Sequence, residues 1–142
     1  LATANRVALP VVAARLSRSV AMIEADRGDD AQAADVLSRS SETFARGIPG
    51  TRPVARTELL RAEFLARGGR QSEVLRACRG AVAVLTLLRS GIEAELLEPC
   101  LAAFDAAARR DPSLGQPLLE EMFAAAQLAQ SGLTSRQIDQ AT

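Results

Sequence analysis

The stretch RTELLRAEFLARGGRQSEVLRACRGAVAVLTLL, residues 56–88, decides the fold class of this chain. Apolar residues recur at helical spacing on both sides of Gly68-Gly69, so the stretch reads as two helices joined by a tight turn. The apolar residues expected at the contact between the two helices are Leu59, Ala62, Leu65, Ala66, Val74, Cys78, Ala81 and Leu85. Small residues among them allow two helices to approach closely, and the larger ones fill the flanks. The stretch therefore predicts an antiparallel helix pair, about residues 52–90, of the kind that builds helical-repeat proteins.

A second pair is predicted before it, at about residues 10–47. Pro10 suits a first helical turn, and Gly28 marks the turn between the two helices. Asp29 or Asp30 is available as the N-cap of the second helix, and Gly47 suits its end. Thr51 then offers an N-cap for the helix that follows.

A third pair is predicted at about residues 93–131. Gly91 is expected to end the helix before it, and Asp111-Pro112-Ser113 separates its two helices. Pro99 falls near the first turns of the helix that begins at about Glu93. Gly132 is expected to end the third pair. The capping-box sequence at residues 134–137 is then expected to open one more helix, residues 134–142.

A shift of the sequence by 41 residues places the three pairs in register. Ala21, Ala62 and Ala103 become equivalent on the first helices, and Gly28 and Gly69 become equivalent at the turns. Two further sets align on the second helices, namely Leu37, Cys78 and Leu119, and Phe44, Leu85 and Ala126. One pair cannot bury its own apolar face, whereas stacked pairs share a continuous core. We expect one all-α domain over residues 1–142.

The second pair is similar to a tetratricopeptide repeat (TPR). The residues that carry the resemblance are Leu59, Ala62, Leu65, Gly69, Val74, Cys78 and Ala81. The pitch of 41 residues is longer than the family's pitch of about 34, and the family's aromatic residues and closing proline are absent. The resemblance implies a right-handed TPR-like superhelix of about three antiparallel helix pairs.

A narrower resemblance covers about residues 40–142. The segments PGTRPVARTELLRAEFLA, RACRGAVAVL, AELLEPCLAAF and EEMFAAAQLAQSG are similar to the helical repeats that precede CHAT domains in bacterial proteins. CHAT domains are caspase-like and use a His/Cys dyad. The resemblance implies a non-catalytic interaction or regulatory module, whose partner is another protein, a peptide or the parent protein's own downstream domain. Because Leu1 is not methionine, we expect the chain to be part of a longer protein.

Composition excludes several other classes of function. The 17 basic residues, all arginine, balance 17 acidic residues, so the basic excess of a nucleic-acid-binding surface is missing. No apolar run reaches the roughly 20 residues that a membrane span needs, and we expect no signal peptide. The alanine-rich, lysine-free usage is typical of a GC-rich bacterial genome. These features favour a cytoplasmic bacterial protein.

The residues needed for catalysis are scarce. The chain has no histidine, lysine or tyrosine, so the commonest general bases are missing. The acidic residues Glu93, Glu95, Glu98, Glu120 and Glu121 are interpreted as solvated helix faces. Cys78 and Cys100 are interpreted as small, free core residues, because two thiols make neither a disulfide framework nor a zinc site. We expect no enzyme activity, no cofactor and no metal.

The candidate functional surface is the concave groove formed by the first helix of each pair. By the TPR spacing, its lining would include Arg15, Arg18, Met22, Arg56, Glu63 and Arg67. Guanidinium groups bind carboxylates bidentately, so these arginines favour an acidic peptide. The alternative, that they are ordinary solvated charges, stays open.

Two further possibilities remain at the ends of the chain. The residues 132–137 echo the opening of a LuxR-type helix-turn-helix, so the alternative function is the sensor region of a LuxR-type transcription regulator. The ends of a helical stack expose apolar surface, so self-association into a homo-oligomer is also possible.

Overall fold

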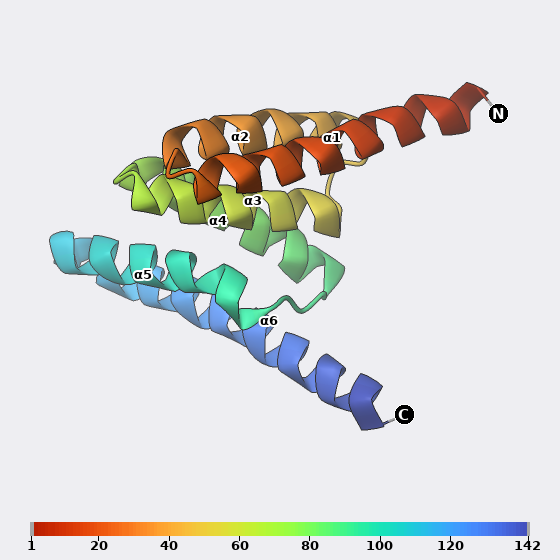
Figure 1. Ribbon diagram of the computed structural model, residues 1–142. Coiled ribbons are helices and arrows are strands. Elements are labelled where there is room, and N and C mark those ends of the chain that lie inside the picture. The colour runs from red at the N-terminus through yellow and green to blue at the C-terminus, as the bar shows by residue number, and fades with distance from the viewer. Residues whose placement is uncertain (1, 142) are drawn as a thin grey trace.

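The computed structural model describes residues 2–141, without the side chains of residues 2–11, 14, 132–136 and 139. Within that range the backbone forms helices only and contains no strand. The helices are α1 (Ala2–Asp26), α2 (Asp30–Gly47), α3 (Arg52–Arg67), α4 (Gln71–Leu88), α5 (Ala94–Arg110), the short 3-10 helix η1 (Pro112–Leu114) and α6 (Gly115–Ala141) (Figure 1). The all-α prediction is confirmed.

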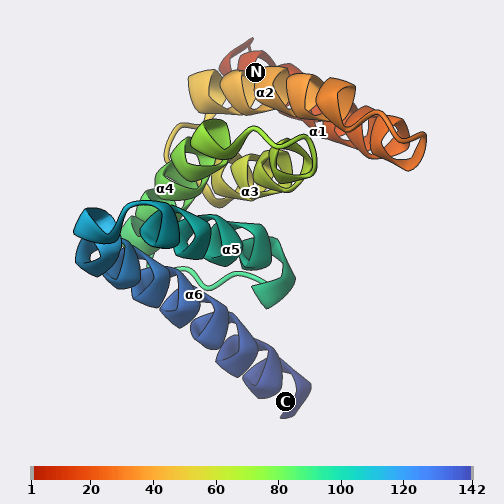
Figure 2. The ribbon, with the colours of Figure 1, turned by 90° about the vertical axis from the view of Figure 1, so that its left-hand side faces the viewer.

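The helices pack in three consecutive pairs that lie one below the next (Figures 1 and 2). The most extensive packing is within the pairs, α1 with α2, α3 with α4 and α5 with α6. At the first junction α2 packs on α3, and at the second α5 contacts both α3 and α4 while α6 contacts α4. The middle pair is therefore covered from both sides.

The turns inside the first two pairs have the same geometry. Gly28 and Gly69 both adopt a left-handed conformation, with φ of 86° and 74°. Gly28 N donates to Ala25 O, and 41 residues later Gly69 N donates to Ala66 O. Glycine reaches this conformation without steric cost, which is why it fits a turn directly after a helix. The repeated turn is the clearest structural sign of the 41-residue repeat.

The core runs through all three pairs as one continuous cluster. The repeated alanines Ala21, Ala62 and Ala103 are buried, with 0%, 0% and 3% of their surfaces exposed. The largest fully buried side chains include Phe44, Phe64, Phe104, Leu37, Leu59, Leu65, Leu85, Ile92, Leu97 and Leu118. Alanine at the repeated position leaves room for neighbouring helices to approach.

Burial does not follow the repeat at every position. Leu37 and Cys78 are fully buried, but the aligned Leu119 is 55% exposed. Phe44 and Leu85 are likewise buried, whereas Ala126 is exposed. Equivalent positions in the sequence of the second helices therefore differ in burial. The reason is that no further helix of the described residues packs on this side of α6.

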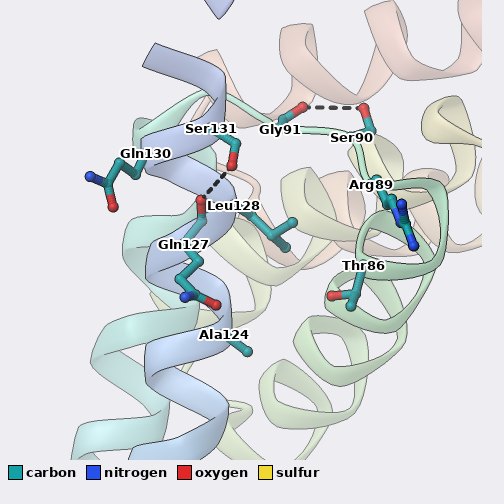
Figure 3. Close-up of a pocket in the computed structure, with 9 residues that line it drawn as sticks. All are labelled: Thr86, Arg89, Ser90, Gly91, Ala124, Gln127, Leu128, Gln130 and Ser131. Atoms are coloured by element: carbon teal, nitrogen blue, oxygen red, sulfur yellow. Dashed lines mark hydrogen bonds between the residues drawn. The ribbon is translucent and has the colours of Figure 1, made fainter. Parts of the chain in front are cut away.

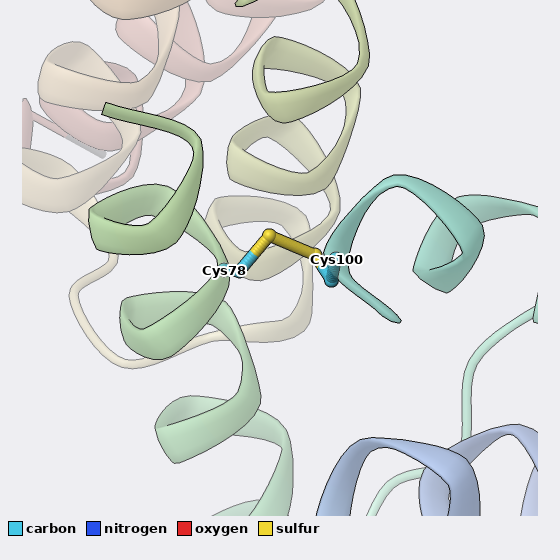
Figure 4. Close-up of a disulfide and its surroundings, with 2 residues drawn as sticks. All are labelled: Cys78 and Cys100. Atoms are coloured by element: carbon cyan, nitrogen blue, oxygen red, sulfur yellow. A yellow bond between two sulfur atoms is a disulfide. The ribbon is translucent and has the colours of Figure 1, made fainter. Parts of the chain in front are cut away.

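The interpretation of Cys78 and Cys100 as free thiols is wrong. The two sulfur atoms form a disulfide that joins α4 to α5, with the Cα atoms 5.5 Å apart (Figure 4). Both residues are fully buried. The sequence could not show the pairing, because it depends on how the second and third pairs are set against each other. Disulfides persist mainly in oxidising compartments, so the bond counts against the cytoplasmic prediction.

Several predicted helix ends are wrong. α1 begins at Ala2 and runs through Pro10, and α6 continues through Gly132 instead of ending there. The separate helix at residues 134–142 is therefore absent, since residues 134–141 belong to α6. A glycine inside a helix costs only about 1 kcal/mol relative to alanine, which neighbouring turns readily offset. α4 ends at Leu88, before Gly91, with Arg89 as a left-handed C-cap.

Replacing Ala62 by leucine should destabilise the protein. The added side chain has no space at a fully buried position between helices, so the free energy of unfolding should fall by about 1–3 kcal/mol. Urea denaturation followed by circular dichroism measures the effect. Ala102→Leu, an exposed alanine on α5, is the matched control and should change stability little. Equal stability of the two variants would contradict the packing described.

Removing the disulfide should also lower stability. The bond closes a loop between residues 22 apart in sequence, for which loop-closure entropy predicts about 3 kcal/mol. The double variant Cys78→Ala/Cys100→Ala should therefore unfold at lower urea concentration than the oxidised protein. Thiol titration of the denatured, unreduced protein should find no free thiol. Finding two free thiols there would show that the bond does not form.

Candidate functional site

Four arginines gather around one small pocket between the first and second pairs. The pocket has a volume of about 210 Å³ and is lined by Arg15 and Arg18 from α1, Phe44 from α2, and Arg52, Pro53 and Arg56 from α3. Phe44 is fully buried, so it supplies an apolar wall. The remaining lining is dominated by guanidinium groups, which makes the pocket strongly basic.

Local structure fixes the two arginines on α3. Thr51 Oγ1 donates to Ile48 O at 2.7 Å, which stabilises the turn before α3, and Pro53 lies in the first turn of the helix. Thr51 occupies the predicted N-cap position but its side chain caps no N–H group of α3. Arg52 and Arg56 are four residues apart, so they lie on the same side of the helix. The N-terminus of α3 adds a partial positive charge.

One carboxylate, that of Glu93, reaches these two arginines from the third pair. Arg56 Nη1 donates to Glu93 Oε1 at 2.9 Å, and Arg52 Nη2 lies 3.8 Å from Glu93 Oε2. Arg52 Nη2 also donates to Gly91 O at 3.3 Å. Glu93 Oε2 is buried and accepts no hydrogen bond from the described residues. Glu93 thus shows that these guanidinium groups are placed to hold a carboxylate.

The ionisation of two residues reflects this environment. Partial burial tends to raise the pKa of Glu93, but the hydrogen bond from Arg56 and the charges of Arg56 and Arg52 outweigh it, so the pKa is lowered. The pKa of Arg18 is also lowered, first by burial and then by repulsion from Arg56 and Arg15. The guanidinium groups therefore repel one another across the pocket.

Arg15 and Arg18 make no ion pair among the described residues. Four arginines and one glutamate leave an excess of three positive charges around the pocket. An anion that enters would relieve the repulsion and accept charge-assisted hydrogen bonds. The lining offers cations and apolar surface, which suits binding of a carboxylate.

The structure brings together only part of the predicted groove. Arg15, Arg18 and Arg56 meet at the pocket. Met22 is 41% exposed on α1 and does not line it. Arg67 and Glu63 lie near the opposite end of α3, where Arg67 Nη2 and Glu63 Oε1 form an ion pair at 2.6 Å.

Arg67 is further engaged by its neighbours. Its Nη1 atom lies 3.6 Å from Asp30 Oδ1, and its guanidinium carbon lies 5.1 Å from the centre of the Phe64 ring. These contacts satisfy the charge locally, and Arg67 and Glu63 do not line the pocket that Arg15, Arg18 and Arg56 share. The site includes instead Arg52 and Glu93, which the sequence analysis did not select. The four-residue spacing of Arg52 and Arg56 was the one feature of the sequence that could have placed Arg52 beside Arg56.

A larger pocket of about 710 Å³ lies between the end of α4 and the middle of α6 (Figure 3). Its lining consists of Thr86, Arg89, Ser90, Gly91, Ala124, Gln127, Leu128, Gln130 and Ser131. Two of its hydroxyl groups donate to backbone carbonyls, Ser131 to Gln127 and Ser90 to Gly91. Arg89 is the one charged residue in this lining, so the pocket offers little electrostatic selection.

No protein-family model, curated protein or solved structure matches the chain. Among the described residues, no three or more His, Cys, Asp or Glu side chains lie close enough to hold a metal ion. No helix in the searched part of the chain is both long and apolar enough to cross a bilayer.

The Arg56–Glu93 ion pair should make the free energy of unfolding decrease as the pH falls into the acid range. Because the pKa of folded Glu93 lies below its usual value of 4.5, the pair stabilises the protein above that pH. This contribution is lost as the pH falls through the lowered folded-state pKa. Glu93→Gln should cost less than about 1 kcal/mol at neutral pH, since the pair is partly exposed, and nearly nothing in acid.

Urea denaturation of wild type and variant across this pH range tests the prediction. Glu98→Gln, at an exposed position on α5, is the control and should show no such convergence in acid. A cost for Glu93→Gln that stays constant or grows toward low pH would contradict the assigned ion pair.

Proposed function

We propose that the chain is a non-catalytic protein-interaction module built from TPR-like helical repeats, and that it binds an acidic segment of a partner through its arginine pocket. The observation that carries the proposal is the convergence of Arg15, Arg18, Arg52 and Arg56 on one pocket with a single neighbouring carboxylate. The three stacked helix pairs and their 41-residue repeat support the TPR-like assignment, to which a right-handed superhelix belongs.

The bound group in this proposal is a carboxylate held by guanidinium forks. Glu93 already occupies Arg56 and approaches Arg52, while Arg15 and Arg18 are left for a second carboxylate. A glutamate- or aspartate-rich segment supplies several carboxylates on a flexible backbone. Pro53, a partly exposed apolar residue of the lining, offers contact surface for the stems of such side chains. Acidic peptide is therefore the ligand class that fits the pocket best.

The resemblance to the repeats that precede CHAT domains supports placing this module in such a parent protein. The acidic segment then belongs either to a separate protein or to the parent's own downstream domain. The LuxR-type alternative rests on the sequence of residues 132–137, which echoes the opening of that motif. Those residues lie within α6, which runs without a break from Gly115 to Ala141.

A fluorescein-labelled oligoglutamate peptide tests the proposal by fluorescence anisotropy, with oligoglutamine as the uncharged control. Arg15→Ala/Arg18→Ala should weaken binding on the order of tenfold or more, because each lost charge-assisted hydrogen bond contributes about 1.5 kcal/mol. Glu93→Gln should tighten binding, since it removes the competing carboxylate. Added salt should weaken binding by the wild type.

Arg109→Ala/Arg110→Ala is the matched control, because it removes two exposed arginines at the end of α5, away from the pocket. It should bind the peptide as the wild type does. Equal loss in both double variants would mean that net charge, and not the pocket, determines binding. No binding by the wild type, or no effect of Arg15→Ala/Arg18→Ala, would remove the proposed site.

A further inference from the structure

The disulfide and the carboxylate that enters the arginine pocket are carried by the same short stretch of the third pair. Glu93 is the N-cap residue of α5, and Cys100 lies about two helical turns further along. Cys100 is bonded to Cys78 on α4 (Figure 4). Glu93 Oε1 accepts a hydrogen bond of 2.9 Å from Arg56 Nη1 on α3. The beginning of α5 is therefore attached to the second pair at two points, one covalent and one ionic.

The ionic attachment competes with any carboxylate that enters the pocket. Glu93 is bound to Arg56 and lies 3.8 Å from Arg52, so a ligand that uses these two guanidinium groups must displace it. The Oε2 atom of Glu93 is buried and accepts no hydrogen bond from the described residues. A buried acceptor without a donor lowers the stability of this contact, and displacement returns the atom to water. Glu93 is thus an internal ligand of the pocket that an external carboxylate can replace.

The strength of this competition depends on how closely α5 is held to the second pair. An internal ligand acts through its effective concentration, which falls when the segment that carries it gains freedom. The disulfide limits that freedom because it fixes α5 to α4 between two fully buried residues. Without the bond, α5 still packs on α3 and α4 through apolar residues such as the fully buried Leu97. Reduction therefore loosens the junction without removing its core.

A small pocket of about 200 Å³ lies beside the disulfide. Its lining includes Val82 on α4 and Phe104 on α5, each four residues after one of the cysteines, so it lies about one helical turn from the bond. The Arg79–Glu121 ion pair, whose side chains are 52% and 35% exposed, also lines this pocket. Solvent thus comes close to the buried bond, which gives a thiol reductant a short approach when the junction opens.

We infer that the Cys78–Cys100 disulfide controls the arginine pocket, because the oxidised bond holds Glu93 there as an internal competitor and reduction releases it. An acidic segment then binds more tightly to the reduced protein, a consequence that rests on the proposed function. A dithiol reductant supplies the two electrons and two protons. One of its thiolates attacks a sulfur of the bond, its second thiol closes a disulfide within the reductant, and both cysteines leave as thiols.

The first measurement compares the affinity of the labelled oligoglutamate peptide for the oxidised protein and for the protein kept in dithiothreitol. Reduction should lower the Kd by about two- to fivefold, which is the range expected for a partly exposed ion pair. In Glu93→Gln the response to dithiothreitol should disappear, because the competing carboxylate is gone. Cys78→Ala/Cys100→Ala should bind as the reduced wild type does and should not respond to dithiothreitol. Circular dichroism should show that the reduced protein is folded.

The second measurement needs no peptide. The protein is equilibrated with mixtures of reduced and oxidised dithiothreitol, the thiols are alkylated in acid-quenched samples, and mass spectrometry gives the oxidised fraction. Because coupling between two sites is reciprocal, Glu93→Gln should shift this equilibrium toward the dithiol by the same factor of about two to five. Glu98→Gln, at an exposed position on α5, is the matched control and should leave the equilibrium unchanged. Oligoglutamate should shift the wild type in the same direction as Glu93→Gln does.

Several results would overturn the inference. One is a disulfide equilibrium that is the same in wild type and Glu93→Gln, and another is a redox response of peptide binding that persists in Glu93→Gln. Peptide that binds equally well to the oxidised and reduced wild type would also contradict it. So would a reduced protein that is unfolded, since no pocket would then remain to be controlled.

Failure of the proposed function gives a different pattern. If no peptide binds in either redox state but Glu93→Gln still shifts the disulfide equilibrium, then the pocket does not take acidic peptide. The coupling of Glu93 to the disulfide is supported in that case, because the second measurement does not involve the peptide.

Discussion

Each helix pair in this chain has apolar residues on two sides, and packing within the pair buries only one of them. The rest of the structure depends on this constraint, because the second side must find a neighbour. The contrast between α1 and α3 shows it at single residues. Ala21 and Ala62, which occupy equivalent positions, are both buried, whereas Ile23 is half-exposed and its counterpart Phe64 is covered. Stacking of pairs, more than the pairs themselves, builds the core.

The junction between the second and third pairs carries links of a different kind. The disulfide joins α4 to α5, and Arg79 forms hydrogen bonds of 2.8 and 3.1 Å with both carboxylate oxygens of Glu121, which joins α4 to α6. At the first junction, two ion pairs bring Arg67 close to Asp30 and Arg70 close to Asp35. Apolar packing aligns the pairs and the disulfide ties the second pair to the third, whereas each partly exposed ion pair adds at most about 1 kcal/mol. The structure accordingly holds the pairs in a set arrangement.

The arginine pocket is a consequence of the same stacking. It takes residues from α1, α2 and α3, and Glu93 reaches it from the beginning of α5, so all three pairs contribute to one electrostatic cluster. Burial lowers the pKa of Arg18, and repulsion from Arg56 and Arg15 lowers it further. The fold holds this repulsion because the helices are fixed by contacts elsewhere. A carboxylate ligand gains from that arrangement, which is the physical basis of the proposed function.

The sequence by itself determined the helices, their order in pairs and the turns at Gly28 and Gly69, because apolar periodicity and the demand for a left-handed turn residue are local properties. It also singled out Arg15, Arg18 and Arg56, which the structure brings to one pocket. Helix ends at Pro10 and Gly132 were misjudged, since α1 runs through Pro10 and α6 runs through Gly132. A glycine inside a helix costs only about 1 kcal/mol relative to alanine, so it is a weak local stop signal. Only the tertiary structure decided that Cys78 meets Cys100, that Arg52 and Glu93 join the pocket, and that Arg67 does not. Those outcomes depend on how far each helix pair is shifted and rotated relative to the next. Contacts between side chains that are far apart in the sequence determine that arrangement.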